Sequence, residues 1–360
     1  MTALRDRLVR LIEASGPISV ADYFSACLFD PDHGYYTARN PFGGDGDFTT
    51  APEVSQMFGE LVAVWLVSAW DAAGQPSGAL VAEIGPGRGT LMCDILRTLR
   101  SLSPELPRMF RFAMIEASPR LAGIQKTALD DFDVDIAWHA TVATLPEAPL
   151  FIVGNELFDA LPLRQYVRVA GGWRERMVGL AGDATLTFTA GPTLISSAAI
   201  LPVALEKLPE GTIVETAPAR TALMAEISAH IATRDGAGLF FDYGTGTWGP
   251  GDTLQSVYRH AHVNVFAHPG EADLTSHVDF GALAAAARSQ GLKDRLASQG
   301  DFLRAMGLCE RSERLAQGKD KQTAARIAGE AERLAGQAGM GTLFKALAVT
   351  PPDLAVPGFY

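Results

Sequence analysis

The stretch that decides the fold is Glu83-Ile84-Gly85-Pro86-Gly87-Arg88-Gly89-Thr90, a glycine-rich turn between two apolar segments. Before the turn, the short apolar run Leu80 to Ile84 predicts a buried strand. After it, Thr90 to Leu99 carries the apolar periodicity of a helix. In open α/β sheets, ligands bind beyond the carboxyl ends of the strands, where a glycine turn lets the backbone approach them. We therefore expect a nucleotide-type cofactor here, although a tight strand-to-helix turn without a ligand would need the same glycines.

The residues around the turn discriminate between cofactors. A dinucleotide fingerprint requires GxGxxG, but Thr90 stands where the last glycine would be. Glu83 would repel a pyrophosphate and suits a cofactor with a cationic aminoacyl end. Glu116, at the end of the next expected strand, can accept hydrogen bonds from both ribose hydroxyls, although an acid near a helix start gives the same pattern. We thus predict S-adenosyl-L-methionine (SAM), bound by Glu83, Gly85, Gly87, Gly89 and Glu116.

Short apolar strands alternate with helices from Leu80 onward, which predicts a doubly wound α/β fold. The expected strands are Leu80 to Ile84, Phe112 to Ile115, Val134 to Trp138, Leu150 to Val153 and Gly238 to Phe241. Helices are expected over residues 54–70, 276–290 and 319–337, with a Gly-rich loop after Asp242. Hairpin-like segments around Gly171-Gly172 and Gly182-Asp183 predict a β-rich insertion at about residues 163–212. We expect an N-terminal helical cap over residues 1–75 and a SAM-binding methyltransferase domain over residues 76–360, ending in C-terminal helices.

A second motif, Asn155-Glu156-Leu157-Phe158-Asp159-Ala160-Leu161-Pro162, follows the fourth expected strand. Glu156 and Asp159 are three residues apart, so one side of a helical turn can carry both carboxylates. Such a pair can hold a guanidinium by bidentate hydrogen bonds and aim one nitrogen at a methyl carbon. The alternative interpretation is the acidic first turn of a solvated helix. The catalytic candidates are Asn155, Glu156 and Asp159.

Composition excludes several classes of partner. The net charge of −11, from 30 Lys and Arg against 41 Asp and Glu, disfavours binding to nucleic-acid backbones and anionic lipids. The three cysteines are scattered, and the group His260, His262 and His268 lacks a metal-ligand pattern, so we expect neither disulfides nor a metal. Neither a signal-peptide h-region nor an apolar run of the roughly 20 residues that span a bilayer is present. We expect a soluble cytoplasmic protein.

Six motifs occur in order along nearly the whole chain. They are Gly16-Pro17-Ile18-Ser19-Val20, Gly34-Tyr35-Tyr36, Gly46-Asp47-Phe48-Thr49-Thr50-Ala51-Pro52-Glu53-Val54-Ser55-Gln56-Met57-Phe58-Gly59, Glu83 to Gly89, Asn155 to Pro162, and Phe241-Asp242-Tyr243-Gly244. With them the chain resembles the MidA-like family of class I SAM-dependent methyltransferases, which includes the mitochondrial protein-arginine methyltransferase needed for respiratory complex I assembly. Gly85 to Gly89 alone would be a weak signal.

The resemblance implies a seven-stranded methyltransferase sheet, SAM as the donor and a protein arginine as the acceptor. A symmetrically dimethylated arginine on a complex I core subunit is the product it suggests. It also implies that a loop closes over the methionine end of SAM through Gly46, Phe48, Thr49, Pro52 and Glu53. Composition alone would make this segment a surface loop.

Other assignments stay open at this point. His139, with Trp138, follows the third expected strand and is a candidate for stacking on the adenine or hydrogen bonding to it, or for a buried structural role. Two other functions are also open. A non-catalytic assembly factor could keep the fold as a partner-binding module, and a small molecule could be the methyl acceptor. The oligomeric state is not indicated.

Overall fold

The computed structural model describes residues 2–38, 49–200 and 205–359, which form two compact units. The first unit comprises Met1–Phe48, Phe158–Thr221 and Thr247–His277, and the second Thr49–Leu157, Ala222–Gly246 and Val278–Tyr360. This division corrects the expected boundary at residue 75. Helix α5 (Gln56–Ala72) belongs to the second unit because it packs on that unit's strands, whereas the β-rich insertion belongs with residues 1–48.

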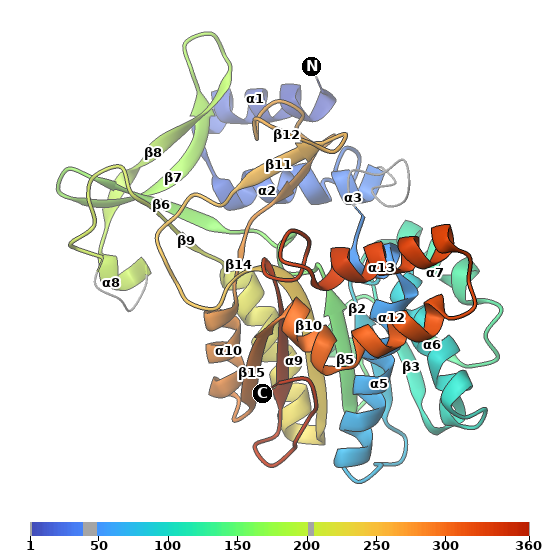
Figure 1. The fold of residues 1–360 in the computed structure, drawn as a ribbon. Helices are drawn as coiled ribbons and strands as arrows, with labels where there is room; N and C mark the ends of the chain where they lie inside the picture. Colours follow the sequence, from blue (N-terminus) through green and yellow to red (C-terminus); the bar gives the residue numbers. More distant parts are fainter. Residues whose placement is uncertain (1, 39–48, 201–204, 360) are drawn as a thin grey trace. The chain divides into compact units, whose positions relative to one another are not determined.

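The second unit is built on one eight-stranded sheet (Figure 1). Seven strands run in the order β15-β16-β10-β5-β2-β3-β4, and the two-residue β14 (Val278–Asp279) pairs with β10. Their bounds are β2 (Leu80–Ile84), β3 (Arg111–Ile115), β4 (Ile136–His139), β5 (Leu150–Asn155), β10 (Gly236–Thr245), β15 (Lys293–Ser298) and β16 (Phe344–Thr350). Only β16 runs antiparallel to its neighbours in this row of seven. This mixed sheet of mainly parallel strands confirms the predicted α/β fold.

The strand order reverses beside β2, and this reversal positions the site. From β2 the chain adds β3 and then β4 on one side, and then returns to place β5 on the other side of β2. A crevice opens beyond the carboxyl ends of the strands where the order of a doubly wound sheet reverses. The turn after β2 and the segment after β5 both leave the sheet at this edge.

Both faces of the sheet are buried, as expected for strands that are apolar without alternation. Val81, Phe151 and Leu239 point to one face, where they join the core formed with α5 and α6 (Thr90–Leu102). Their sequence neighbours, such as Ile152, point to the opposite face because side chains alternate along a strand. Helix α10 (Phe280–Ser289) packs on β10, β15 and β16.

The second unit contains further α-helices. They are α4 (Ala51–Val54), α7 (Pro119–Leu129), most of α9 (Pro218–Arg234), α11 (Gln299–Ala305), α12 (Leu308–Ala316) and α13 (Lys321–Ala335). The helix expected over residues 54–70 is α5, which begins at Gln56. Ser55, with φ −162°, separates it from α4 and caps it by accepting a hydrogen bond from the amide of Met57 (3.4 Å). The helix expected from residue 276 begins at Phe280, where the Asp279 carboxylate caps it.

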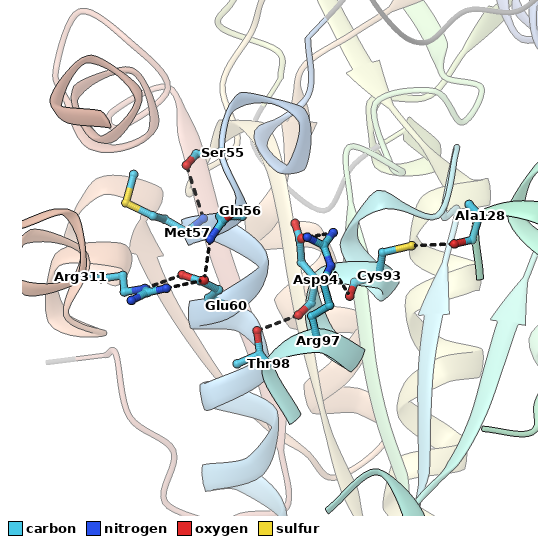
Figure 2. Close-up of polar contacts among 10 residues, drawn as sticks. All are labelled: Ser55, Gln56, Met57, Glu60, Cys93, Asp94, Arg97, Thr98, Ala128 and Arg311. Atoms are coloured by element: carbon cyan, nitrogen blue, oxygen red, sulfur yellow. Dashed lines mark hydrogen bonds and ion pairs between the residues drawn. The ribbon is translucent and has the colours of Figure 1, made fainter. Parts of the chain in front are cut away.

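Close packing and polar contacts join α5 and α6 to each other and to neighbouring helices, and Figure 2 shows the polar contacts. A Cβ atom at Gly59 of α5 would lie 2.4 Å from Cβ of Asp94 of α6, so only glycine lets the two helices approach this closely. Arg311 of α12 donates two hydrogen bonds of 2.7 Å to the Glu60 carboxylate of α5. The Cys93 thiol of α6 donates to the carbonyl of Ala128 in α7 (3.4 Å).

The first unit is rich in β-structure. One five-stranded sheet contains β1 (Ile18–Ser19), β6 (Arg164–Val169), β7 (Gly172–Leu180), β8 (Leu186–Ile195) and β9 (Ile213–Thr216). Helices α1 (Ala3–Ser15), α2 (Val20–Phe29), α3 (Tyr35–Ala38) and α8 (Ser197–Ile200) complete it. The buried face of α1, Leu4, Leu8 and Ile12, joins α2 in its core.

A second sheet of the first unit was not predicted. The segment expected as a Gly-rich loop after Asp242 contains β11 (Gln255–Tyr258), β12 (Ala261–Val263) and β13 (Asp273–Thr275). These strands have three or four residues, and their turn uses Arg259 and His260 at positive φ (51° and 63°) instead of glycine or asparagine. Neither periodicity nor turn chemistry therefore marks them. None of the helices in the described part of the chain is long and apolar enough to cross a membrane.

Candidate cofactor and active site

The glycine turn after β2 has the tight geometry that its sequence predicts. Gly85, Gly87 and Gly89 have φ values of 65°, 52° and 82°, in the left-handed region where a Cβ atom is unfavourable. A Cβ atom at Gly85 would also lie 2.8 Å from Cδ1 of Leu157. The amide of Gly85 donates to the carbonyl of Ile115 (3.1 Å), which fixes the turn to the end of β3. The backbone conformation therefore favours glycine at all three positions, and a Cβ atom at Gly85 would also displace the Leu157 side chain.

The turn leads directly into the amino terminus of α6. Gly89 is the N-cap residue, and as a glycine it has no side chain that could accept a hydrogen bond from the first turn of the helix. Amide groups at the start of a helix lack partners within the helix and favour oxygen atoms of a ligand. The start of α6 can therefore donate to a ligand's oxygen atoms.

The Glu83 side chain lies beneath the turn as a buried acid. Only 3% of the residue is exposed, and its Oε2 atom has no hydrogen-bond partner among the described residues. Burial raises the pKa of Glu83 well above its ordinary value, and a hydrogen bond from the Met92 amide opposes this shift. The nearby charges of Asp94 and Glu116 raise it further. A cationic group beside Oε2 would stabilise the ionised carboxylate, as predicted for the aminoacyl end of the cofactor.

Sequence reasoning missed Asp94, a second buried acid on the first turns of α6. The residue is 4% exposed, and burial raises its pKa to about 7 even though Arg97 lies 2.7 Å away and lowers it. Burial prevails because the Arg97 side chain is 59% exposed and its charge is screened by water. Asp94 therefore adds negative charge near Glu83, and Glu60 adds negative charge near Asp94. Figure 2 shows Glu60 and Asp94 on neighbouring helices.

Glu116 follows β3 at the same edge and is held from several sides. Its amide donates to the carbonyl of His139 (2.9 Å), and its Oε1 accepts from the amide of Ser118 (2.8 Å). Its Oε2 accepts from Nε2 of Gln125 (3.0 Å). Burial raises the pKa of Glu116, whereas these hydrogen bonds lower it. Gln125 was not a predicted site residue, although its place in the buried stripe of α7 could have signalled it.

His139 and Trp138 end β4 next to Glu116. Nδ1 of His139 lies 3.1 Å from Oγ1 of Thr144, and the residue is half-buried. The Trp138 indole donates to Oε1 of Gln125 (3.0 Å), and the Lys126 ammonium lies 5.2 Å from the centre of a Trp138 ring. The two residues therefore border the Glu116 side of the edge, and a direct role of His139 toward adenine stays a prediction.

The segment after β5 presents Glu156 in an unusual conformation. Its φ of 50° is left-handed, and its amide donates to the carbonyl of Phe241 in β10 (2.8 Å). Oε1 of Glu156 accepts from Nδ2 of Asn155 (3.1 Å) and from the amide of Ala51 (3.2 Å). A strained residue held by several contacts is a pattern typical of functional sites. Asn155 therefore contacts Glu156 as a supporting residue.

The predicted pairing of Glu156 with Asp159 on one side of a helical turn is wrong. Residues 156–160 form a bend and a turn, because the left-handed Glu156 takes the backbone out of the helical region. Asp159 is 6% exposed and belongs to the other compact unit. The i, i+3 spacing assumed a helix that the chain does not form, and a catalytic role of Asp159 stays a prediction.

The segment implied to close over the cofactor is described only from Thr49 onward, and Gly46 and Phe48 lie outside the described residues. Thr49 is exposed, and Pro52 occupies the buried first turn of α4. Oε1 of Glu53 lies 3.9 Å from Nη1 of Arg88 in the glycine turn, and burial raises the pKa of Glu53. With the Ala51 amide on Glu156, α4 links the glycine turn to the segment after β5.

Comparison with known proteins decides the family. Residues 61–297 match the family model described as "Putative S-adenosyl-L-methionine-dependent methyltransferase". The chain is 33% identical to the mitochondrial protein arginine methyltransferase NDUFAF7 of Danio rerio, over 95% of this chain and 85% of that relative. Its identity to the Homo sapiens protein of that name is 32%, over 86% and 74% of the two chains. The chain belongs to the MidA-like family of class I SAM-dependent methyltransferases.

A solved structure supports the same assignment for this MidA-like chain. A Burkholderia thailandensis protein bound to S-adenosyl-homocysteine shares the fold with a TM-score of 0.86 and 29% identity, over 98% of this chain and 92% of that one. S-adenosyl-homocysteine is SAM without its methyl group. SAM is thus the cofactor of the MidA-like chain, as the glycine turn and the two acids predict.

The residues of this edge fit SAM chemically. Glu83 supplies a buried carboxylate for the cationic aminoacyl end, and Glu116 supplies an acceptor for ribose hydroxyls. The left-handed glycines leave the space that side chains would otherwise take. Among the described residues, no group of three or more His, Cys, Asp and Glu is arranged to hold a metal ion.

Proposed function

We propose that this MidA-like methyltransferase transfers the methyl group of SAM to an arginine side chain of a protein. The observation that carries the proposal is the Glu156 carboxylate, held by Asn155 and the Ala51 amide at the carboxyl end of β5. That strand pairs with β2, which leads into the cofactor turn. The names of the Danio rerio and Homo sapiens relatives support the same acceptor. The family resemblance further suggests that the acceptor protein is a core subunit of respiratory complex I.

The chemistry of arginine explains why a fixed carboxylate is needed. A guanidinium has a pKa of about 12.5 or higher, so it remains charged near neutral pH and is a weak nucleophile. When bound, SAM supplies an electrophilic methyl carbon attached to a sulfonium. Glu156 offsets the guanidinium charge and orients one nitrogen toward that carbon. The N–C bond forms as the C–S bond breaks in an in-line displacement, and the nitrogen then releases one proton.

Preorganisation of the Glu156 carboxylate contributes to the rate. Its two described donors fix Oε1 before an acceptor arrives, so little reorganisation is needed at the moment of transfer. The left-handed backbone of Glu156 is held by the hydrogen bond from its amide to Phe241. A positioned charge of this kind acts through alignment and electrostatic stabilisation and does not require a strong base.

The test separates protein acceptors from small molecules. Protein and low-molecular-weight fractions, prepared from cells that lack this chain, are each incubated with the purified chain and SAM carrying an isotopically labelled methyl group. We expect label in the protein fraction, and its loss when Glu156 is replaced by Gln. Label in the small-molecule fraction alone would contradict the proposed acceptor. Absence of transfer, together with normal SAM binding, would favour a non-catalytic assembly factor.

A further inference from the structure

Helix α7 carries a fully buried polar residue where its pattern calls for an apolar one. Leu121, Gln125 and Leu129 are spaced by four residues and form the buried face of this helix. Gln125 is 0% exposed. A buried amide group is costly unless its hydrogen-bonding atoms find partners. The contacts of Gln125 therefore indicate why the amide is there.

The Gln125 amide joins three parts of the cofactor edge. Its Nε2 atom donates to the carbonyl of Gly87 (2.9 Å) and to Oε2 of Glu116 (3.0 Å). Its Oε1 atom accepts from the indole Nε1 of Trp138 (3.0 Å). The partners determine the orientation of the amide, since an indole N–H can only donate whereas a carbonyl and a carboxylate accept. Both N–H groups of Gln125 are thereby used.

We propose that Gln125 is a positioning residue for the cofactor, which holds the Glu116 carboxylate and the Gly87 carbonyl in place before SAM binds. One side chain links the turn after β2, the segment after β3 and the end of β4. The helix approaches the turn closely, because a Cβ atom at Gly89 would contact Cγ of Gln125 at 3.6 Å. The proposal depends on Glu116 facing the ribose, and it holds whichever molecule accepts the methyl group.

Electrostatics gives the same residue a second effect on Glu116. Burial raises the pKa of Glu116, and the hydrogen bond from Gln125 lowers it. An ionised carboxylate only accepts hydrogen bonds, as recognition of two ribose hydroxyls requires. Gln125 thus both places Glu116 and favours the form that binds. Glutamate at position 125 would oppose both effects, whereas methionine would remove them without adding charge.

The experiment measures binding of S-adenosyl-homocysteine by calorimetry to the full chain, between about pH 6 and about pH 8.5. We expect Gln125→Met to weaken binding about tenfold at every pH, as the loss of a hydrogen bond to a charged group would do. Gln125→Glu should bind weakly at high pH, because two carboxylates then lie in contact. At low pH the affinity of this variant should approach that of the wild type, because one proton can then bridge the two carboxylates. A purely structural role would not produce this recovery.

A matched control and a second variant complete the test. Gln299 of α11 is also 0% exposed and donates from Nε2 to the carbonyl of Leu334 (2.9 Å). It follows β15, which lies at the opposite end of the strand order from β4. Gln299→Glu should lower thermal stability, but at each pH its dissociation constant for S-adenosyl-homocysteine should equal that of the wild type. If Gln125→Met does not fold, Trp138→Phe removes the hydrogen bond from the indole to Oε1 of Gln125 at a half-buried residue. This variant should weaken binding about threefold. Affinities within about twofold of wild type for these site variants, or a Gln125→Glu affinity that does not recover at low pH, would overturn the proposal.

Discussion

Gly85→Ala tests whether the turn and the segment after β5 are packed against each other as the structure shows. The left-handed φ of 65° costs an L residue about 1–2 kcal/mol. The new Cβ atom would lie 2.8 Å from Cδ1 of Leu157, which adds an overpacking cost of about 1–3 kcal/mol. We expect the free energy of unfolding to fall by about 2–5 kcal/mol, measured by urea denaturation without ligand. Since Leu157 follows Glu156, methyl transfer should fall as well.

Gly89→Ala is the matched control for this prediction. Its φ is 82°, but its Cβ atom would meet Gln125 at an ordinary contact distance of 3.6 Å. Gly89→Ala should therefore lower the free energy of unfolding only by the cost of the left-handed backbone, about 1–2 kcal/mol. In addition, Leu157→Ala should lower the free energy of unfolding less in the Gly85→Ala background than in the wild type, because it removes the side chain that the new Cβ atom overlaps. Equal destabilisation by the two alanines, with additive effects of Leu157→Ala, would refute the packing.

Three further predictions concern the acids of the second unit. Asp94→Asn should stabilise the protein more at about pH 8 than at about pH 4. The pKa of Asp94 is about 7 in the folded protein against an ordinary 3.8, so the stability that this carboxyl group provides below pH 3.8 is lost as the pH rises through 7. Equal changes in melting temperature at both pH values would contradict this prediction. Binding of SAM should release a proton from Glu83, because burial raises the pKa of this carboxyl group and a bound cation lowers it. The affinity for SAM should therefore rise with pH. Identical calorimetric binding enthalpies in phosphate and Tris buffers would exclude proton release. Glu156→Gln should lower the transfer rate about a hundredfold or more while SAM affinity stays within about threefold, and normal turnover would remove its proposed role.

The sheet was predictable because its strands carry strong local signals. Each of the five expected strands is present, and their bounds differ from the structure by a few residues, as for β4, which begins at Ile136 instead of Val134. The strands β15 and β16 were not predicted. The sequence Lys293–Ser298 contains three charged residues and does not resemble a buried strand, although it pairs along its length with β16. Such an edge strand is determined by its partner more than by its own pattern.

The parts of the site that require one residue type were predictable from the sequence. The parts whose geometry depends on an unusual backbone conformation of an ordinary residue were not. The left-handed glycines mark the turn from sequence alone, because other residues rarely adopt that conformation. Glu156 also has a positive φ, yet glutamate gives no sign of it, so the predicted helical turn and its pairing with Asp159 failed. Gln125 and Asp94 were missed because a polar residue in an amphipathic helix is ordinarily taken to face solvent.

Identification of the methylated amino acid determines whether arginine is the acceptor. Protein labelled by the chain with isotopically marked SAM is hydrolysed to amino acids, and the labelled residue is identified by mass spectrometry, with Glu156→Gln protein and excess S-adenosyl-homocysteine as controls. We predict label in methylarginine, and none in either control. Label in another amino acid, or methylarginine formed equally by the Glu156→Gln variant, would contradict it.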